Sequence, residues 1–287
     1  MQQPELPSAV MRWVRRGEID LIEIDHPVGR GLVSRQGAQL LDWQATDQPP
    51  LIWLSPATRF EAGRPLRGGI PLCWPWFGPR PGLPAHGLVR QRNWRLEAAS
   101  HDPEGCTLRW RLDSDPEQRA LWPHDFELVL TMRLGLSIKL SLAMRVPNDI
   151  DEPVSFAFHS YLALPDVRTA TVDGLSGSIR HDKLSNGAPT AQCGIFQPGK
   201  QCDSVFTDAS GRYVLQRAPW PALRIEAENC PSAIVWTPGE QGAAAMADMA
   251  DWSGMLCVET GAALADGLRL QAGQWHRVVT RIGVVEA

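Results

Sequence analysis

An alternation of apolar and polar side chains between Phe126 and Val146 is the feature that most limits what this chain can fold into. Every even position in this stretch is apolar, whereas the odd positions are mostly polar or small, with Val129 as the exception. A period of two places the apolar side chains on one face of an extended backbone, so the pattern predicts half-buried β-strand. A single straight strand of this length would be rare, and Gly135 is the expected hairpin turn.

Short apolar segments with the same character recur along the chain. TLRWRLD places Leu108, Trp110 and Leu112 on one face, and GLVSRQGAQLLDWQ, ALRIEA and SAIVWTPG are bounded by turn-forming residues. This spacing predicts many antiparallel strands and few short helices, one of them in DPEQRALWP. No low-complexity linker and no fixed-period repeat divides the chain. We therefore expect an all-β fold, a single large antiparallel β-sandwich domain over residues 1–287, with residues 1–19 as a less ordered extension.

Composition and charge exclude several classes of function. The net charge is −4, from 28 basic and 32 acidic residues, and no basic block favours a nucleic-acid partner. No segment approaches the ~20 apolar residues of a membrane span, and the N-terminus lacks an apolar signal core. We expect a cytoplasmic protein with no membrane partner. The six cysteines form no C-x-x-C pair and the seven histidines show no ligand spacing, so we expect buried thiols and no metal site.

The segment RGGIPLCWPWFGPRPGLPAHGLVR, from Arg67 to Arg90, is irregular but not a loose linker. Its five prolines and five glycines exclude a helix, whereas Trp74, Trp76 and Phe77 indicate that it is anchored on the sandwich. Two arginines at its ends suit a phosphate or carboxylate, because guanidinium groups match the geometry of an oxyanion. A pair of ordinary surface arginines is the alternative interpretation of these two residues.

Two further segments contain groups capable of acid–base chemistry. In FAFHSYL, an extended backbone places His159 on the face opposite Phe156 and Phe158. In MLCVETG, Glu259 stands in an apolar setting, and burial would raise the pKa of its carboxyl group. The two side chains together could supply a general acid and a general base. A core histidine and a solvent-exposed glutamate on an edge strand are the alternative interpretations of these local patterns.

The chain resembles a known family through an ordered set of motifs: RGGIPLCWPWFG, LPAHGLVR, LWPHDFEL, FHSYL, CDSVF, IVWTPG, MADM and CVETG. Together they are similar to the hexose-6-phosphate mutarotases, or glucose-6-phosphate 1-epimerases, of the aldose-epimerase superfamily. The resemblance extends from about residue 20 to residue 283. It implies a galactose-mutarotase-like supersandwich and an isomerase that interconverts the anomers of a sugar phosphate. It also implies a monomer whose only partner is that small-molecule substrate, with no cofactor and no metal.

The resemblance also implies roles for individual residues. His159 matches the general acid of the family and Glu259 matches its general base. Four more residues match the substrate-binding set: Arg67, His86, Arg90 and Asp203. The chain departs from some relatives in having Ala85 where they have glutamine, and in having no lysine within EQGAAAMADM. Both departures bear on how tightly a phosphorylated sugar is held.

Two other functions are left open by the sequence. The chain could be an aldose 1-epimerase that acts on unphosphorylated sugars, in which case the two arginines serve the structure. It could also be a non-catalytic carbohydrate-binding protein, because it has twelve tryptophans and indole rings stack on sugars or fill large cores. The presence of both His159 and Glu259 argues against the second alternative.

Overall fold

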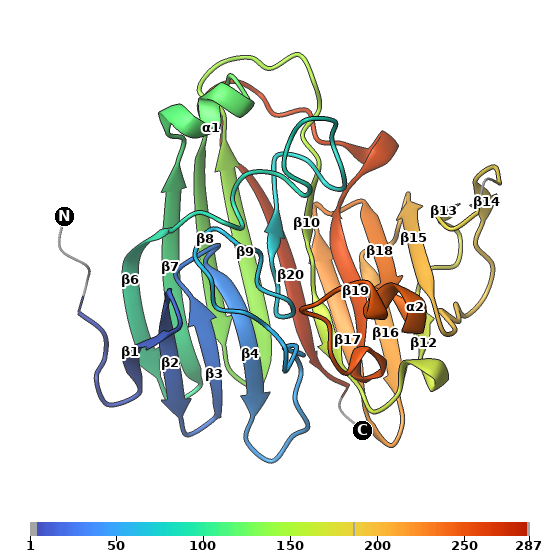
Figure 1. Cartoon of the computed structure of the whole chain (residues 1–287), viewed down its shortest axis with the longest axis horizontal. Helices are drawn as coiled ribbons and strands as arrows, with labels where there is room; N and C mark the ends of the chain where they lie inside the picture. Colours follow the sequence, from blue (N-terminus) through green and yellow to red (C-terminus); the bar gives the residue numbers. More distant parts are fainter. Residues whose placement is uncertain (1–4, 186, 286–287) are drawn as a thin grey trace.

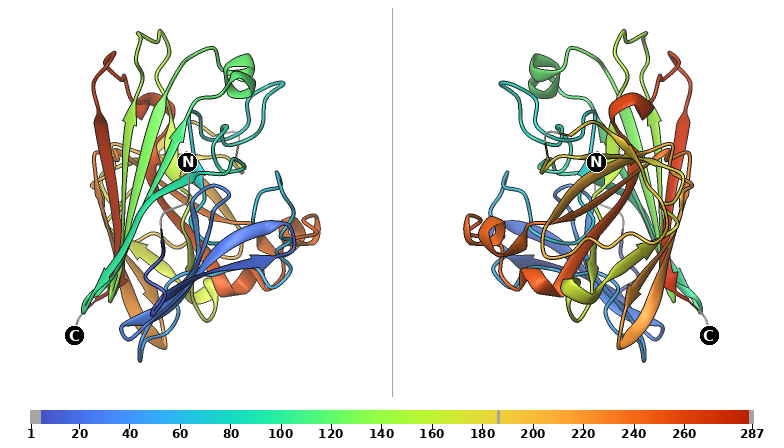
Figure 2. Two further views of the ribbon diagram at one scale, coloured as in Figure 1. Left: turned by 90° about the vertical axis from the view of Figure 1, so that its left-hand side faces the viewer. Right: turned by 90° about the vertical axis from the view of Figure 1, so that its right-hand side faces the viewer.

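The computed structural model describes residues 5–185 and 187–285. Within these residues the strands form three antiparallel sheets arranged in two layers (Figure 1). Figure 2 views the layers from the side, with the green strands of one layer opposite the blue strands of the other. The predicted class, a large antiparallel β-sandwich with few short helices, is confirmed.

One layer is a single eight-stranded sheet, here called the back sheet. In spatial order its strands are β12 (Thr171–Asp173), β16 (Arg212–Arg217), β17 (Trp220–Glu228), β20 (His276–Val284), β9 (Ser137–Arg145), β8 (Glu127–Leu134), β7 (Gly105–Asp113) and β6 (Arg95–Asp102). The other layer contains two sheets. The N-terminal sheet consists of β1 (Met11–Arg16), β2 (Ile19–His26), β3 (Gly29–Ser34) and β4 (Gln39–Ala45).

The second sheet of that layer is here called the site sheet. Its strands are β14 (Thr190–Ala191), β13 (Ile179–Asp182), β15 (Cys202–Thr207), β18 (Ser232–Thr237), β19 (Met255–Ala262), β10 (Phe156–Phe158) and β5 (Leu72–Cys73), and β11 (Tyr161–Ala163) also pairs with β19. The helices of the described residues are α1 (Pro116–Leu121) and α2 (Gly239–Ala244), with three short 3₁₀ turns at Val167–Thr169, Trp252–Gly254 and Leu264–Asp266. Neither α-helix in this part of the chain has the length and apolarity needed to cross a membrane.

The alternating segment forms the predicted hairpin. Strands β8 and β9 pair with Leu128 opposite Met144 and with the even-numbered side chains buried. The chain turns at Gly135, whose carbonyl oxygen accepts a hydrogen bond of 2.8 Å from the indole of Trp43 in the N-terminal sheet. Leu136 departs from the alternation and is 61% exposed, because it lies in the turn rather than in either strand.

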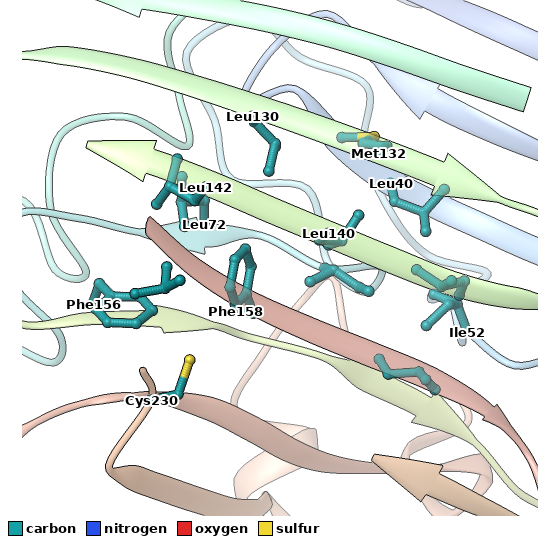
Figure 3. Close-up of a cluster of buried hydrophobic side chains, with 14 of the residues drawn as sticks. Leu40, Ile52, Leu72, Leu130, Met132, Leu140, Leu142, Phe156, Phe158 and Cys230 are labelled. Carbon is teal, nitrogen blue, oxygen red and sulfur yellow. The ribbon is translucent and has the colours of Figure 1, made fainter. Parts of the chain in front are cut away.

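Apolar side chains from both layers meet in one core (Figure 3). Leucines and methionines of β8 and β9 face Phe156 and Phe158 of β10 and Leu40 of β4, all of them buried. Full burial of one such side chain stabilises the fold by about 1.5–3 kcal/mol. The core therefore fixes one face of the site sheet against the back sheet and leaves the other face to carry polar groups.

Two local expectations have different outcomes. The helix expected in DPEQRALWP is α1, which begins with a capping box between Asp115 and Gln118. The expectation of a less ordered extension over residues 1–19 is wrong for Met11–Arg16, because this segment is β1 and pairs along its whole length with β2. Residues 1–4 lie outside the described residues. All six cysteines are free thiols, and five of them are buried.

The segment from Arg67 to Arg90 (the loop) packs against the site sheet. His86 and Gly87 both have a positive φ, of 64° and 81°. A Cβ on Gly87 would overlap the carbonyl oxygen of Trp74, which instead accepts a hydrogen bond of 2.8 Å from the N–H of Leu88. A glycine is therefore required at this point for the close approach of two backbone segments.

We predict that Gly87→Ala destabilises the protein much more than Gly82→Ala. Both glycines have a positive φ, but a Cβ on Gly82 would meet no described atom within 4 Å. The control variant thus carries only the cost of about 1–2 kcal/mol for a side chain in the left-handed region, whereas Gly87→Ala must also push the two segments apart. Urea unfolding of both variants measures the difference, and equal losses of unfolding free energy would contradict this packing.

Candidate active site

The pairing of β10 and β11 with β19 brings the predicted acid and base together. Phe158 lies opposite Thr260 and Tyr161 lies opposite Cys257, so the register is the same on both sides of the short break between β10 and β11. This register sets His159 across from Glu259, on the face of the site sheet away from the core. His159 Nδ1 lies 3.5 Å from Glu259 Oε1.

Aromatic rings hold the imidazole of His159 in place. The ring stacks on Tyr161 with a centroid distance of 4.8 Å and an interplanar angle of 9°. The rings of His86 and Trp236 approach it edge-on, at 5.5 and 6.1 Å. Tyr161 is itself stacked on Trp53, with a centroid distance of 5.9 Å. Because the ring is packed on several sides, His159 has little freedom to move away from Glu259.

Burial governs the protonation of this pair. Glu259 is 0% exposed, and neither carboxyl oxygen has a hydrogen-bond partner among the described residues. Burial raises the pKa of Glu259 well above its ordinary value, although the positive charge of Lys183 opposes this shift. Burial also lowers the pKa of His159, and His86 and Arg90 lower it further. Both shifts favour the neutral forms, a protonated carboxyl group on Glu259 and an uncharged imidazole ring on His159.

Both predicted arginines reach this region. Arg67 Nη1 donates a hydrogen bond of 3.2 Å to the hydroxyl of Tyr161, and its Nε lies 3.3 Å from Asp248 Oδ2. Arg90 Nη2 donates a hydrogen bond of 2.8 Å to the carbonyl oxygen of Ala85. Arg90 Nε is buried and has no hydrogen-bond partner among the described residues, whereas the buried Nε of Arg67 faces the carboxylate of Asp248. Arg90 therefore keeps an unmet N–H donor.

His86 lies near positive charges and is kept neutral mainly by burial. Burial lowers the pKa of His86 to about 3, and Arg90, Lys183 and Arg67 contribute to the shift. The backbone N–H of Gly78 donates to Nδ1 of His86 at 3.3 Å. We assign the ring proton to Nε2 on the basis of this hydrogen bond. His86 then offers an uncharged N–H donor.

Asp203 lies on the same face of the site sheet, two strands away from Glu259. Its carboxyl group is half-buried, and burial raises its pKa while Lys183 opposes the shift. Lys183 Nζ lies 3.7 Å from Asp203 Oδ1. The structure thus brings together all six residues that the sequence marked, and adds Lys183 and Asp248, which were not assigned a role.

The two added residues had weak signals in the sequence. Asp248 belongs to the MADM motif, but its pairing with Arg67 depends on how the segment after α2 packs. Lys183 follows β13, and it reaches Asp203 only because β13 pairs with β15. Histidine spacing likewise gave no sign that ligand atoms of His159, Cys257 and Glu259 would lie within 4.8 Å of one another.

A separate groove of about 460 Å³ lies over the N-terminal sheet. It is lined by charged side chains of both signs, among them Arg12, Arg30, Glu23 and Asp42. None of the predicted site residues contributes to it. The two acid–base candidates, His159 and Glu259, and the rings that pack around them lie on the site sheet instead, and we place the candidate active site there.

Comparison with known proteins identifies the family. The profile of the Aldose 1-epimerase family matches residues 20–283, so the chain belongs to this family. A protein of Escherichia coli named "Putative glucose-6-phosphate 1-epimerase" is 32% identical, over 88% of this chain and 86% of the relative. A Salmonella typhimurium protein of the same name is 33% identical, over 85% and 83%. The crystal structure of a "putative mutarotase" from Salmonella typhimurium has a TM-score of 0.92 and 29% identity, over 100% of this chain and 97% of the other. The resemblance seen in the motifs is confirmed.

We predict that Glu259→Gln stabilises the protein at pH 8 and leaves its stability nearly unchanged at pH 4. A raised pKa in the folded state means that wild-type stability is present at low pH and is lost as the pH rises toward the folded pKa of Glu259. The amide carries no charge at either pH. Urea unfolding at both pH values checks this, and an equal effect at pH 4 and pH 8 would contradict the burial of an unpaired carboxyl group.

Proposed function

We propose that this protein interconverts the α and β anomers of aldohexose 6-phosphates, as a glucose-6-phosphate 1-epimerase. One observation carries the proposal. The site sheet carries a buried carboxyl group, Glu259, whose oxygens have no hydrogen-bond partner among the described residues, and Arg90 has a buried Nε–H group without an acceptor among them. Buried polar groups are costly unless they are paired. A sugar phosphate supplies both missing partners, because its hydroxyl groups donate and its phosphoryl oxygens accept.

The His159–Glu259 pair then performs the reaction. Glu259, as a carboxylate, takes the proton of the C1 hydroxyl, and His159, as an imidazolium, gives a proton to the ring oxygen. The C1–O5 bond breaks and an open-chain aldehyde forms. Rotation about C1–C2 exposes the other face of the carbonyl group, and the reverse proton transfers close the ring. Each well-placed acid or base accelerates such a step by about 10²–10⁴-fold.

The single proton of the resting pair is sufficient for this chemistry. The neutral pair and the ion pair differ only in the position of that proton across a separation of 3.5 Å. Hydroxyl groups that donate to Glu259 stabilise its carboxylate form, and a nearby phosphate stabilises the imidazolium of His159. Substrate binding thereby favours the reactive ion pair over the neutral pair of the free protein.

One observation favours the epimerase of unphosphorylated sugars as a second candidate. Arg67 is already held by Asp248 and by the hydroxyl of Tyr161, as expected of an arginine that serves the structure. The acid–base pair would act on either substrate, so the two candidates differ only in whether the positive charges recognise a phosphate.

Glu259→Gln and His159→Asn should each reduce kcat by about 10²-fold or more while glucose 6-phosphate still binds. The double variant should be impaired far less than the product of the two single effects, because the groups act as one unit. The kinetics of anomer exchange, with ligand affinity measured by calorimetry, check both statements. Near-normal turnover in a correctly folded single variant would remove that residue from the mechanism.

Arg67→Ala and Arg90→Ala should each lower kcat/KM for glucose 6-phosphate by about 10–100-fold, because a charge-assisted hydrogen bond is worth about 1.5–3 kcal/mol. The rate with glucose should barely change. Lysine should rescue only partly, since it retains the charge but not the planar guanidinium group. Arg59→Ala, at an exposed position, is the matched control. Equal losses with both sugars would favour the epimerase of unphosphorylated sugars.

A further inference from the structure

Lys183 is a charged residue of the site that has no role in the acid–base mechanism and was not among the predicted substrate-binding residues. Its backbone N–H donates a hydrogen bond of 2.8 Å to the carbonyl oxygen of Asp203, which anchors it at the end of β13. Its ammonium group lies 3.7 Å from Asp203 Oδ1 and 4.9 Å from the ring centroid of Phe77. Phe77 belongs to the loop, so Lys183 lies between the site sheet and the loop.

The ammonium group of Lys183 influences the same imidazole ring, that of His86, as the two arginines. Arg90, Lys183 and Arg67 all contribute to the lowered pKa of His86. Lys183 is also the positive charge that opposes the raised pKa of Glu259. The contacts agree with this, because the ring of Phe77, which Lys183 approaches, meets the ring of His86 edge-on at 5.1 Å, and Arg90 donates to the carbonyl oxygen of Ala85, the residue before His86.

The contacts of these three cations leave positive charge uncompensated. Asp248 pairs with Arg67 and Asp203 pairs with Lys183, whereas the hydrogen bond of Arg90 goes to a neutral carbonyl group. The ion pair of Lys183 is the looser of the two, because 3.7 Å exceeds hydrogen-bond distance. Its side chain is 35% exposed, and four rotatable bonds allow the ammonium group to turn toward a ligand.

We propose that Lys183 is a substrate-binding residue that contacts the phosphoryl group of the sugar phosphate as the third cation of this site. The inference rests on the proposed function and extends it. A phosphate monoester carries about −1.5 to −2 charges at neutral pH. A single uncompensated arginine cannot neutralise this charge. Lys183 moves from Asp203 to a phosphoryl oxygen on binding, which frees the Asp203 carboxylate to accept a hydrogen bond from a sugar hydroxyl group.

The test measures binding separately from turnover. Calorimetry gives the Kd of inorganic phosphate and of glucose 6-phosphate for the wild type and for Lys183→Ala, Lys183→Gln, Lys183→Arg and Asp203→Asn. Lys200→Ala is the control, because Lys200 is an exposed lysine outside the site. Thermal unfolding of each variant shows whether it is folded, and kcat/KM is then measured for glucose 6-phosphate and for glucose.

We expect Lys183→Ala and Lys183→Gln to raise Kd for both phosphate-containing ligands by about tenfold or more. Lys183→Arg should restore most of the affinity, and Lys200→Ala should leave it unchanged. Asp203→Asn should leave the affinity for inorganic phosphate unchanged or increase it, because an acidic group beside the cation is removed. The loss of kcat/KM in the two neutral variants should be confined to glucose 6-phosphate.

Two results would overturn the proposal. One is an unchanged Kd for inorganic phosphate in both neutral variants. The other is an equal loss of kcat/KM for glucose and glucose 6-phosphate that Asp203→Asn reproduces, since Lys183 would then act only by positioning Asp203. A failure of the proposed function has a different signature, namely a wild type that binds phosphate through Lys183 but does not accelerate anomer exchange.

Discussion

The site depends on one constraint, the register in which β10 and β11 pair with β19. Because side chains alternate along a strand, this register sends Phe158 into the core and sets His159 opposite Glu259 on the other face. A slip of one residue would exchange these faces, burying an imidazole among hydrocarbon side chains and exposing a phenyl ring. The packing that stabilises the sandwich therefore also fixes the distance between His159 and Glu259, and the hydrophobic core and the candidate site cannot vary independently.

Burial of the same sheet face determines the electrostatics of the site. Removing Glu259 and His159 from water disfavours both charges and favours a neutral carboxyl group beside a neutral imidazole ring. Burial, with a further contribution from Arg90, Lys183 and Arg67, lowers the pKa of His86 far enough to keep it an uncharged donor. In the proposed function, an anionic ligand that binds among these cations changes this balance and couples phosphate recognition to the protonation state of His159 and Glu259.

The sequence predicted those features that have a local physical cause. Alternation over residues 126–146 fixed the hairpin at Gly135, and the proline- and glycine-rich segment was correctly expected to be an anchored loop. Features that depend on which strands become neighbours could not be predicted from the sequence. Lys183 meets Asp203 only through sheet pairing, and β1 was missed because its exposed edge gives MRWVRR little alternation. Family resemblance, rather than the local patterns, identified His159 and Glu259 as a pair.

The central claim of the proposed function is that the positive charges around His159 and Glu259 direct this pair toward phosphorylated sugars. Magnetisation-transfer NMR measures it most directly, because the exchange between α and β anomeric protons is followed at equilibrium, with and without the wild-type protein. The account predicts that the protein accelerates exchange of glucose 6-phosphate at least tenfold more efficiently than exchange of glucose at equal concentrations. Equal acceleration of both sugars would contradict phosphate recognition, and no acceleration of either would contradict the assignment of His159 and Glu259.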